Sequence, residues 1–165
     1  MRSAPPRSLR GWLPTLGRLV LAAVWIGAGV AKITDLDGAV RAVRAYRLLP
    51  DIAAQVVGAG LPVVEIMLGL LLLAGAGVRV GAVVSAVLLL GFLVGIGSAW
   101  ARGLRIDCGC FGSGGELKAG ESPSYGWDLV RDGALFVLAI ALARWPNGYL
   151  AIDGLLTGGR KEERA

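Results

Sequence analysis

The sequence contains no histidine among its 165 residues. Histidine is the side chain that changes charge near neutral pH, and it is also the commonest metal ligand. Its absence excludes histidine-based acid–base catalysis and leaves any metal site to thiolates and carboxylates. The chain also has only two cysteines, so any thiol chemistry must use one or both of them.

Charged residues are scarce as well, at 18% of the chain, whereas 55% of the residues are hydrophobic. Soluble domains carry about 25% charged and about 45–50% apolar residues. The apolar excess lies in long runs, each close to the roughly 20 residues with which a helix crosses a hydrocarbon core. We expect four spans, at about residues 15–33, 56–77, 78–101 and 124–143. The predicted fold class is all-α, an integral membrane four-helix bundle in a lipid bilayer.

The segments outside these spans are short. A basic lead covers residues 1–14, the membrane domain covers residues 15–145 with a polar loop at 102–123, and a polar tail covers residues 146–165. The lead and first run also resemble a cleaved signal peptide, but the run is longer than a typical signal core. The net charge of +5 comes from residues that flank apolar spans. This pattern indicates membrane topology and not nucleic-acid binding.

A short amphipathic helix is expected between the first and second spans, within residues 35–49. Leu36 and Val40 share one helical face, whereas Arg41 and Arg44 share the opposite face. Such a helix lies along a membrane surface, with its apolar side toward the acyl chains.

Small residues recur within two of the spans. Ala23, Gly27 and Ala31 follow one another at intervals of four in the first span, and the third span carries Gly91 and Gly95 at the same interval. Small residues at this spacing allow a second helix to approach closely. The first span is therefore expected to use this stripe for helix packing.

Both cysteines lie in one motif of the polar loop, Asp107-Cys108-Gly109-Cys110-Phe111-Gly112. Glycine accepts backbone dihedrals that other residues resist, so Cys108 and Cys110 can close into a small ring. Such a ring is strained, and strain makes a disulfide a stronger oxidant. The motif favours a thiol–disulfide site, with Asp107 as a supporting residue. Three alternatives stay open: thiols of no consequence, a structural disulfide, and a metal site that only a homodimer would complete.

Several charged residues lie inside or at the ends of apolar spans. Glu65 is near the middle of the second span, where a carboxylate is costly and is a functional candidate by default. It is a candidate proton relay or a partner for a quinone carbonyl; the alternative is an ion pair with Lys32 or Arg131. Lys32, Asp128, Arg131 and Asp132 form either a packing network or the floor of the redox site, where a cation favours the thiolate.

The sequence resembles the MauE-type branch of the DoxX-like integral membrane proteins over about residues 15–145. The resemblance is carried by Gly27-Ala28-Gly29-Val30-Ala31-Lys32, Tyr46 through Pro50, Pro62-Val63-Val64-Glu65 with Gly69, the cysteine motif and, less specifically, Arg131-Asp132. It implies a four-helix membrane bundle. It also implies a role in disulfide formation or electron transfer, as proposed for the maturation of methylamine dehydrogenase, and DoxX-like relatives are linked to quinone and to sulfur oxidation.

We therefore expect a multi-pass thiol–disulfide oxidoreductase of the bacterial plasma membrane. Cys108 and Cys110 would exchange with a thioredoxin-like or substrate protein through a mixed disulfide, and a membrane quinone near Lys32, Glu65 and the fourth span is the candidate cofactor. Lys and Arg are slightly more frequent on the side of the termini, which favours an extracytoplasmic cysteine loop, although the basic surface helix argues the other way. Two alternatives stay open: a non-catalytic scaffold subunit that recruits a redox or sulfur enzyme, and a small-molecule carrier that uses Glu65.

Overall fold

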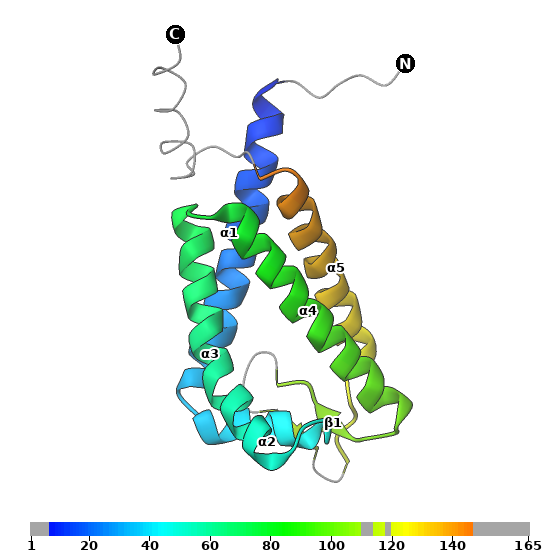
Figure 1. Ribbon diagram of the computed structural model, residues 1–165. Helices are drawn as coiled ribbons and strands as arrows, with labels where there is room; N and C mark the ends of the chain where they lie inside the picture. Colours follow the sequence, from blue (N-terminus) through cyan, green and yellow to red (C-terminus); the bar gives the residue numbers. More distant parts are fainter. Residues whose placement is uncertain (1–6, 110–113, 118–119, 147–165) are drawn as a thin grey trace.

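The computed structural model describes residues 7–109, 114–117 and 120–146. Its elements in chain order are α1 (Arg7–Ile33), α2 (Leu36–Ala45), α3 (Asp51–Ala74), α4 (Val78–Ala101), β1 (Ile106–Asp107), β2 (Gly115–Glu116) and α5 (Tyr125–Arg144). Figure 1 shows four long helices, with α2 lying across the end of the bundle that also holds β1. The protein is mostly helical, as the sequence predicts.

Three of the described helices are long and apolar enough to cross a membrane. They are Trp12–Ile33 within α1, Asp51–Ala74 (α3) and Val78–Ala101 (α4). The fourth expected span, at residues 124–143, corresponds to α5, which carries Asp128, Arg131 and Asp132 in its first half and is not among the three. The apolar helices are thus confirmed for three spans, and a four-helix membrane bundle stays a prediction.

Two helices begin before the apolar runs that revealed them. α1 starts at Arg7, inside the expected basic lead, and α3 starts at Asp51 directly after Pro50. An acidic residue in a first turn is favourable because it faces the positive end of the helix dipole. Apolar runs mark only the part of a helix that can face hydrocarbon, so they miss such polar first turns. Residues 1–6 of the lead and 147–165 of the tail lie outside the described part of the chain.

The long helices associate in two pairs, α1 with α3 and α4 with α5. α3 and α4 meet near their short connection, where a Cβ added to Gly81 would touch the Leu72 side chain. Farther from this connection the two helices diverge (Figure 1). α1 and α4 are linked across the interior by Trp25, whose Nε1 donates to Ser85 Oγ at 2.9 Å. The two pairs are therefore held together toward one end and separate toward the end that carries α2.

The contact between α1 and α3 uses a different face of α1 from the one expected. A Cβ added to Gly29 would lie 2.8 Å from the backbone oxygen of Pro62. Ala23 and Gly27 are exposed instead, and none of the described residues comes within 4 Å of a Cβ built on Gly27. The stripe of Ala23, Gly27 and Ala31 is therefore wrong as the site of contact between the described helices, because the spacing of small residues does not say which stripe meets a neighbour.

α2 forms the expected short helix between the first two spans. The Asp35 side chain caps its first turn, accepting a hydrogen bond from a backbone N–H at 2.8 Å. Ala39 and Ala42 face the bundle and are buried, whereas Arg44 is exposed and pairs with Asp51 of α3 at 2.7 Å. α2 is thus fixed across the open end of the helix pairs.

The loop after α4 contains one feature that the all-α prediction missed. β1 and β2 form an antiparallel pair, with Ile106 opposite Glu116 and Asp107 opposite Gly115. Strands of two residues are too short to show the alternation by which strands are identified in a sequence. This small hairpin returns the chain toward α5 immediately after the cysteine motif.

The α1–α3 contact gives a direct test of this packing. Gly29→Leu should lower the thermal unfolding temperature in detergent, because a side chain there meets backbone that cannot move aside; overpacking typically costs about 1–3 kcal/mol. Gly27→Leu is the matched control on the same helix and should change stability little. Equal losses in the two variants, measured by circular dichroism, would contradict the assigned contact.

Candidate functional site

Cys108 is positioned by the start of α5. Tyr125 is buried, and its hydroxyl donates to the Leu104 backbone oxygen at 2.6 Å and accepts from the Ile106 backbone N–H at 3.1 Å. A buried tyrosine hydroxyl that bonds two backbone groups fixes their separation. The backbone that leads into the cysteine motif is therefore held in one position. No sequence pattern marks Tyr125, because its two partners are about twenty residues away in sequence.

α2 supports the motif from the other side. The Tyr46 hydroxyl donates to the backbone oxygen of Cys108 at 3.1 Å. Gly109 has a positive φ of 67°, and a Cβ there would lie 2.9 Å from the Cβ of Ala42 and 3.1 Å from the Cα of Gly114. Only glycine combines this conformation with this close approach. The residue between the two cysteines is thus fixed as glycine by the fold as well as by the motif.

Arg131 joins the thiol to a pair of buried carboxylates. Its Nη2 lies 3.8 Å from Cys108 Sγ, its Nη1 lies 3.2 Å from an oxygen of Asp128, and its Nε lies 2.9 Å from an oxygen of Asp132. Asp128 and Asp132 are 4% and 3% exposed. The carboxylates fix the orientation of the guanidinium, and a guanidinium next to a cysteine favours the reactive thiolate. Three predicted supporting residues are therefore brought together at Cys108.

Lys32 and Glu65 form a second buried pair, between α1 and α3. Lys32 Nζ lies 2.5 Å from Glu65 Oε1, and the two residues are 5% and 0% exposed. The same Nζ lies 5.9 Å from the centroid of the Phe92 ring of α4. Glu65 Oε2 is buried and has no hydrogen-bond partner among the described residues. Of the two ion-pair partners considered for Glu65, the structure therefore selects Lys32.

A cavity of about 370 Å³ lies between Lys32 and Cys108, which both line it. It lies between α2, α3 and α4, where the helix pairs diverge, and its wall includes Lys32, Tyr46, Phe92 and Cys108. Cys108 thus has Arg131 on one side and the cavity on another. We call this space the apolar cavity, because its other walls are formed by apolar side chains and glycines. Tyr46 was recognisable on the apolar face of α2; the sequence held no signal for the role of Phe92.

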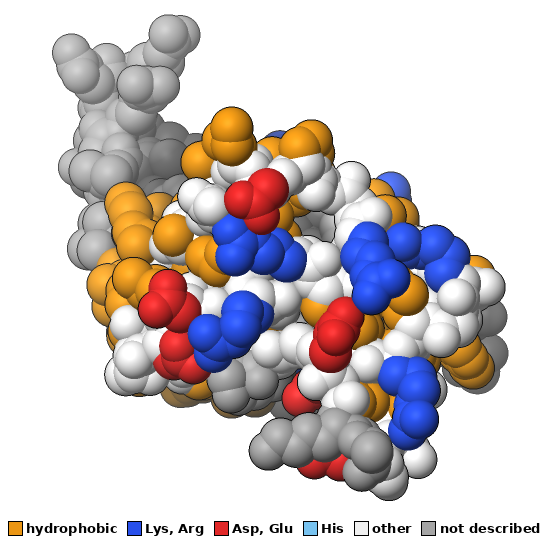
Figure 2. Space-filling model, turned by 90° about the horizontal axis from the view of Figure 1, so that it is seen from below, with side chains coloured by type: hydrophobic (Ala, Val, Ile, Leu, Met, Phe, Trp, Pro, Cys, Tyr) orange, Lys and Arg blue, Asp and Glu red, His pale blue; other side chains and the backbone are white. Residues whose placement is uncertain are grey.

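Asp107 does not join this arrangement. It is exposed on β1, whereas the preceding Ile106 is buried. Asp107 lines a second hollow, of about 670 Å³, which we call the polar groove. This groove is also lined by Arg41, Arg44, Gly115 and Glu116. Figure 2 views this end of the molecule and shows basic and acidic side chains interspersed over it. Asp107 therefore belongs to the charged outer surface beside the motif.

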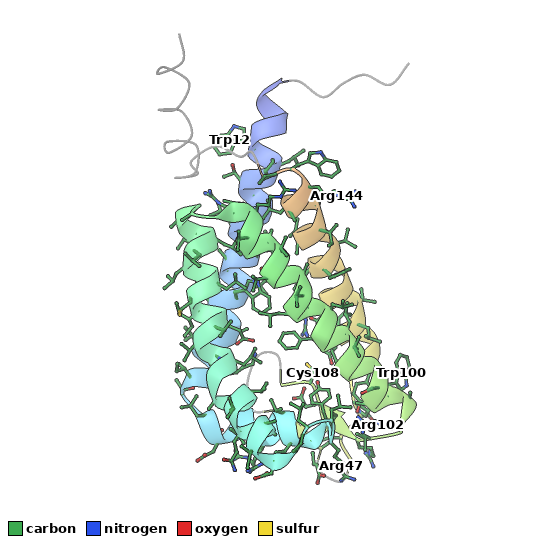
Figure 3. All side chains as sticks on the ribbon, in the orientation of Figure 1. Trp12, Arg47, Trp100, Arg102, Cys108 and Arg144 are labelled. Carbon is green, nitrogen blue, oxygen red and sulfur yellow. The ribbon has the colours of Figure 1, made fainter. Side chains whose placement is uncertain are left out.

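The arrangement places the chemistry at one end of the bundle. Figure 3 shows Cys108 at the end that carries Arg47, Trp100 and Arg102, opposite the end of Trp12 and Arg144. Cys110 lies outside the described residues. No group of three or more cysteine and carboxylate side chains suited to a metal ion occurs in the described ranges.

Comparison with known proteins identifies one family. The family model described as methylamine utilisation protein MauE matches residues 10–145. The chain is 38% identical over 128 residues to the methylamine utilization protein MauE of Paracoccus denitrificans, and this alignment covers 76% of the chain and 66% of that relative. No solved structure matches the chain.

The buried pair of Lys32 and Glu65 predicts strong coupling between the two residues. Lys32→Met leaves a carboxylate buried alone and Glu65→Leu leaves an ammonium buried alone, and breaking such a pair costs about 3–5 kcal/mol. The double variant has no charge at this site and should therefore recover much of the lost stability. Thermal unfolding of the four proteins in detergent forms the double-mutant cycle; strictly additive losses would show that the pair does not act as one unit.

Proposed function

This chain belongs to the MauE family, and we propose that it is a membrane thiol–disulfide redox protein that works through Cys108 and Cys110. The main support is the contact of 3.8 Å between Arg131 Nη2 and Cys108 Sγ. Attack on a disulfide is carried out by the thiolate, and a neighbouring cation stabilises that form. Cys110 follows after a single glycine, which supplies the second sulfur that a redox pair needs.

The proposed reaction is disulfide exchange with a thioredoxin-like or substrate protein. A thiolate of that protein attacks the Cys108–Cys110 disulfide, one bond forms between the two proteins, and one cysteine of this chain leaves as a thiolate. The partner's second thiol then displaces the remaining cysteine. The partner leaves with a disulfide, and this chain keeps two electrons and two protons as a dithiol.

The charged end of the bundle is the surface on which such a partner would dock. The polar groove adjoins the motif through Asp107 and Gly114. Its wall carries both signs of charge, and one of its residues, Glu116, pairs with Arg47 at 3.0 Å; the two side chains are 70% and 65% exposed. Exposed pairs contribute little to stability, so these groups are available to a protein surface at little cost.

The name of the Paracoccus relative connects that protein with methylamine utilisation. We propose that this chain serves the maturation of a protein that requires disulfides, which is the step in such a process that a Cys-Gly-Cys membrane protein can perform. A dithiol–disulfide pair acts on cysteine residues and not on an amine, so the substrate of this chain would be a protein.

We propose further that α5 is the fourth span and that the cysteine loop is extracytoplasmic. α5 runs beside α4 over much of its length (Figure 1). The charged residues in the first half of α5 largely neutralise one another, because Arg131 pairs with both Asp128 and Asp132. Paired charges that face the interior are the form in which membrane helices tolerate ionised residues. An even number of spans would place both ends of the chain on one side and the cysteine loop on the other.

Serine substitution tests the exchange reaction. In cells, one of the variants Cys108→Ser and Cys110→Ser should accumulate a mixed disulfide with the partner, because the remaining thiolate can attack the disulfide of the oxidised partner, in the reverse of the exchange, and the cysteine of this chain that would then displace the partner is absent. The adduct is measured as a mobility shift in non-reducing gels that disappears on reduction, and the doubly substituted chain is the control without adduct. Full cellular activity of either single variant would refute the redox function and favour the scaffold alternative.

Thiol labelling in intact cells tests the topology. A membrane-impermeant maleimide should modify the cysteine motif after reduction, because the loop is expected outside the cytoplasmic membrane. The matched control is Arg79→Cys in the chain that lacks Cys108 and Cys110, since the α3–α4 connection is expected on the opposite side. This control should be labelled only after permeabilisation. The reverse pattern would place the cysteine loop in the cytoplasm.

A further inference from the structure

The side chain of Cys108 faces the interior of the bundle. It is partly buried and packs against a small apolar cluster that includes Ile96, Ile106 and Tyr125. It lines the apolar cavity, and it is not among the described residues that line the polar groove. The sulfur of Cys108 is therefore turned away from the surface on which we expect a partner protein to dock.

Strand geometry accounts for this inward orientation. Successive side chains of a strand point to opposite faces, and in β1 Ile106 is buried whereas Asp107 is exposed. Cys108 follows directly and is partly buried again, whereas Asp107 and Gly114 line the polar groove. A partner that docks over the groove therefore meets the backbone of the cysteine motif before it meets the sulfur of Cys108.

The backbone of Cys108 is held in place from α2. The Tyr46 hydroxyl donates to the Cys108 backbone oxygen at 3.1 Å. The next residue, Gly109, is buried, and a Cβ there would lie 2.9 Å from the Cβ of Ala42. A movement that turned Cys108 outward toward a docked protein would break these contacts. The sulfur of Cys108 therefore stays where the fold places it, beside Arg131.

Arg131 makes Cys108 a good leaving group in disulfide exchange. A guanidinium has five N–H donors in a rigid fork, and two of its nitrogens are taken by Asp132 at 2.9 Å and Asp128 at 3.2 Å. The third nitrogen, Nη2, lies 3.8 Å from Cys108 Sγ. A disulfide breaks faster when the sulfur that leaves is the more stable thiolate. Breakage of a bond to Cys108 Sγ would release that thiolate next to a cation that is already oriented.

We propose that the two cysteines have different roles: Cys108 leaves as a thiolate beside Arg131, and Cys110 is the sulfur that the partner attacks and to which it becomes bonded. The inference rests on the proposed function, and Cys110 receives its role as the only other cysteine of the chain. The partner's thiolate forms a bond to Cys110 Sγ, the Cys108–Cys110 bond breaks, and its electron pair goes to Cys108 Sγ. The partner's second thiolate then attacks the partner sulfur and releases Cys110. The two protons of the partner's thiols end on Cys108 and Cys110.

Access is tested with the two serine variants of the full chain in lipid nanodiscs. The protein probe is a thioredoxin with a single cysteine that carries thionitrobenzoate in a disulfide, so that attack by a free thiolate releases a coloured product. The Cys108→Ser chain should react about tenfold or more faster than the Cys110→Ser chain, because exchange rates depend on access to the attacking sulfur. The control reagent is dithiobis(nitrobenzoate), which releases the same product. It is small enough to reach Cys108, so the difference between the variants should shrink.

The leaving group is tested on the oxidised, unchanged chain with mercaptoethanol, a thiol small enough to reach either sulfur. The products are quenched with acid, alkylated and located by mass spectrometry. We expect mercaptoethanol on Cys110 and the alkyl group on Cys108 in about tenfold excess over the reverse product, because the stabilised thiolate leaves faster. Arg131→Gln should reduce this excess. Arg47→Gln is the matched control, since the Arg47 side chain is 65% exposed and pairs with Glu116.

The outcomes separate the roles of the two cysteines from the exchange reaction itself. Equal rates with the thioredoxin probe, or a faster reaction of the Cys110→Ser chain, would overturn the assignment. An excess of mercaptoethanol on Cys108 in the unchanged chain would do so whether or not the Arg131→Gln protein folds. A partner trapped in cells by Cys110→Ser would overturn the assignment and leave the exchange reaction standing. Serine variants that trap no partner and keep full cellular activity would refute the exchange reaction, and the assignment with it.

Discussion

Buried charge in an apolar bundle has to be paired, and this constraint organises the end of the protein where its thiol lies. Lys32 with Glu65, and Arg131 with its two carboxylates, form two such groups. Breaking a buried pair leaves an uncompensated charge at a cost of about 3–5 kcal/mol, so the members of each group stay together. The first group fixes α1 against α3. The second fixes the start of α5 beside Cys108.

Because α3 and α4 diverge, a cavity forms between them, and one residue from each of the two neighbourhoods, Lys32 and Cys108, lines it. Each of these helices has a close partner on its other side, and the pairs are joined near the α3–α4 connection. The space that opens between them is covered at its end by α2, and Tyr46, directly after α2, also holds the backbone of Cys108. The thiol therefore lies where the charged outer surface, the apolar cavity and the Arg131 cluster meet.

Membership of the MauE family and the local geometry support different parts of this picture. The family match covers residues 10–145 and establishes what kind of protein the chain is. The contacts of Cys108 supply a physical reason for thiol chemistry in this chain, because a guanidinium at 3.8 Å favours the reactive form of the sulfur. The scaffold and carrier alternatives do not require this contact: a docking loop needs no activated thiol, and a carrier needs Glu65 but not Cys108.

The sequence by itself determined the apolar helices, the short amphipathic helix and the motif that holds both cysteines, because apolar runs, periodicity and neighbouring residues are local properties. It also singled out the charged residues in the spans, since their cost in hydrocarbon follows from composition. Only the tertiary structure decided that Glu65 pairs with Lys32, that Arg131 contacts Cys108, and that Gly29 and not Gly27 meets α3. These contacts join residues far apart in the chain, and they depend on how each helix is rotated about its axis. A pattern of small or charged residues leaves that rotation open, and it is fixed only when all the helices pack together.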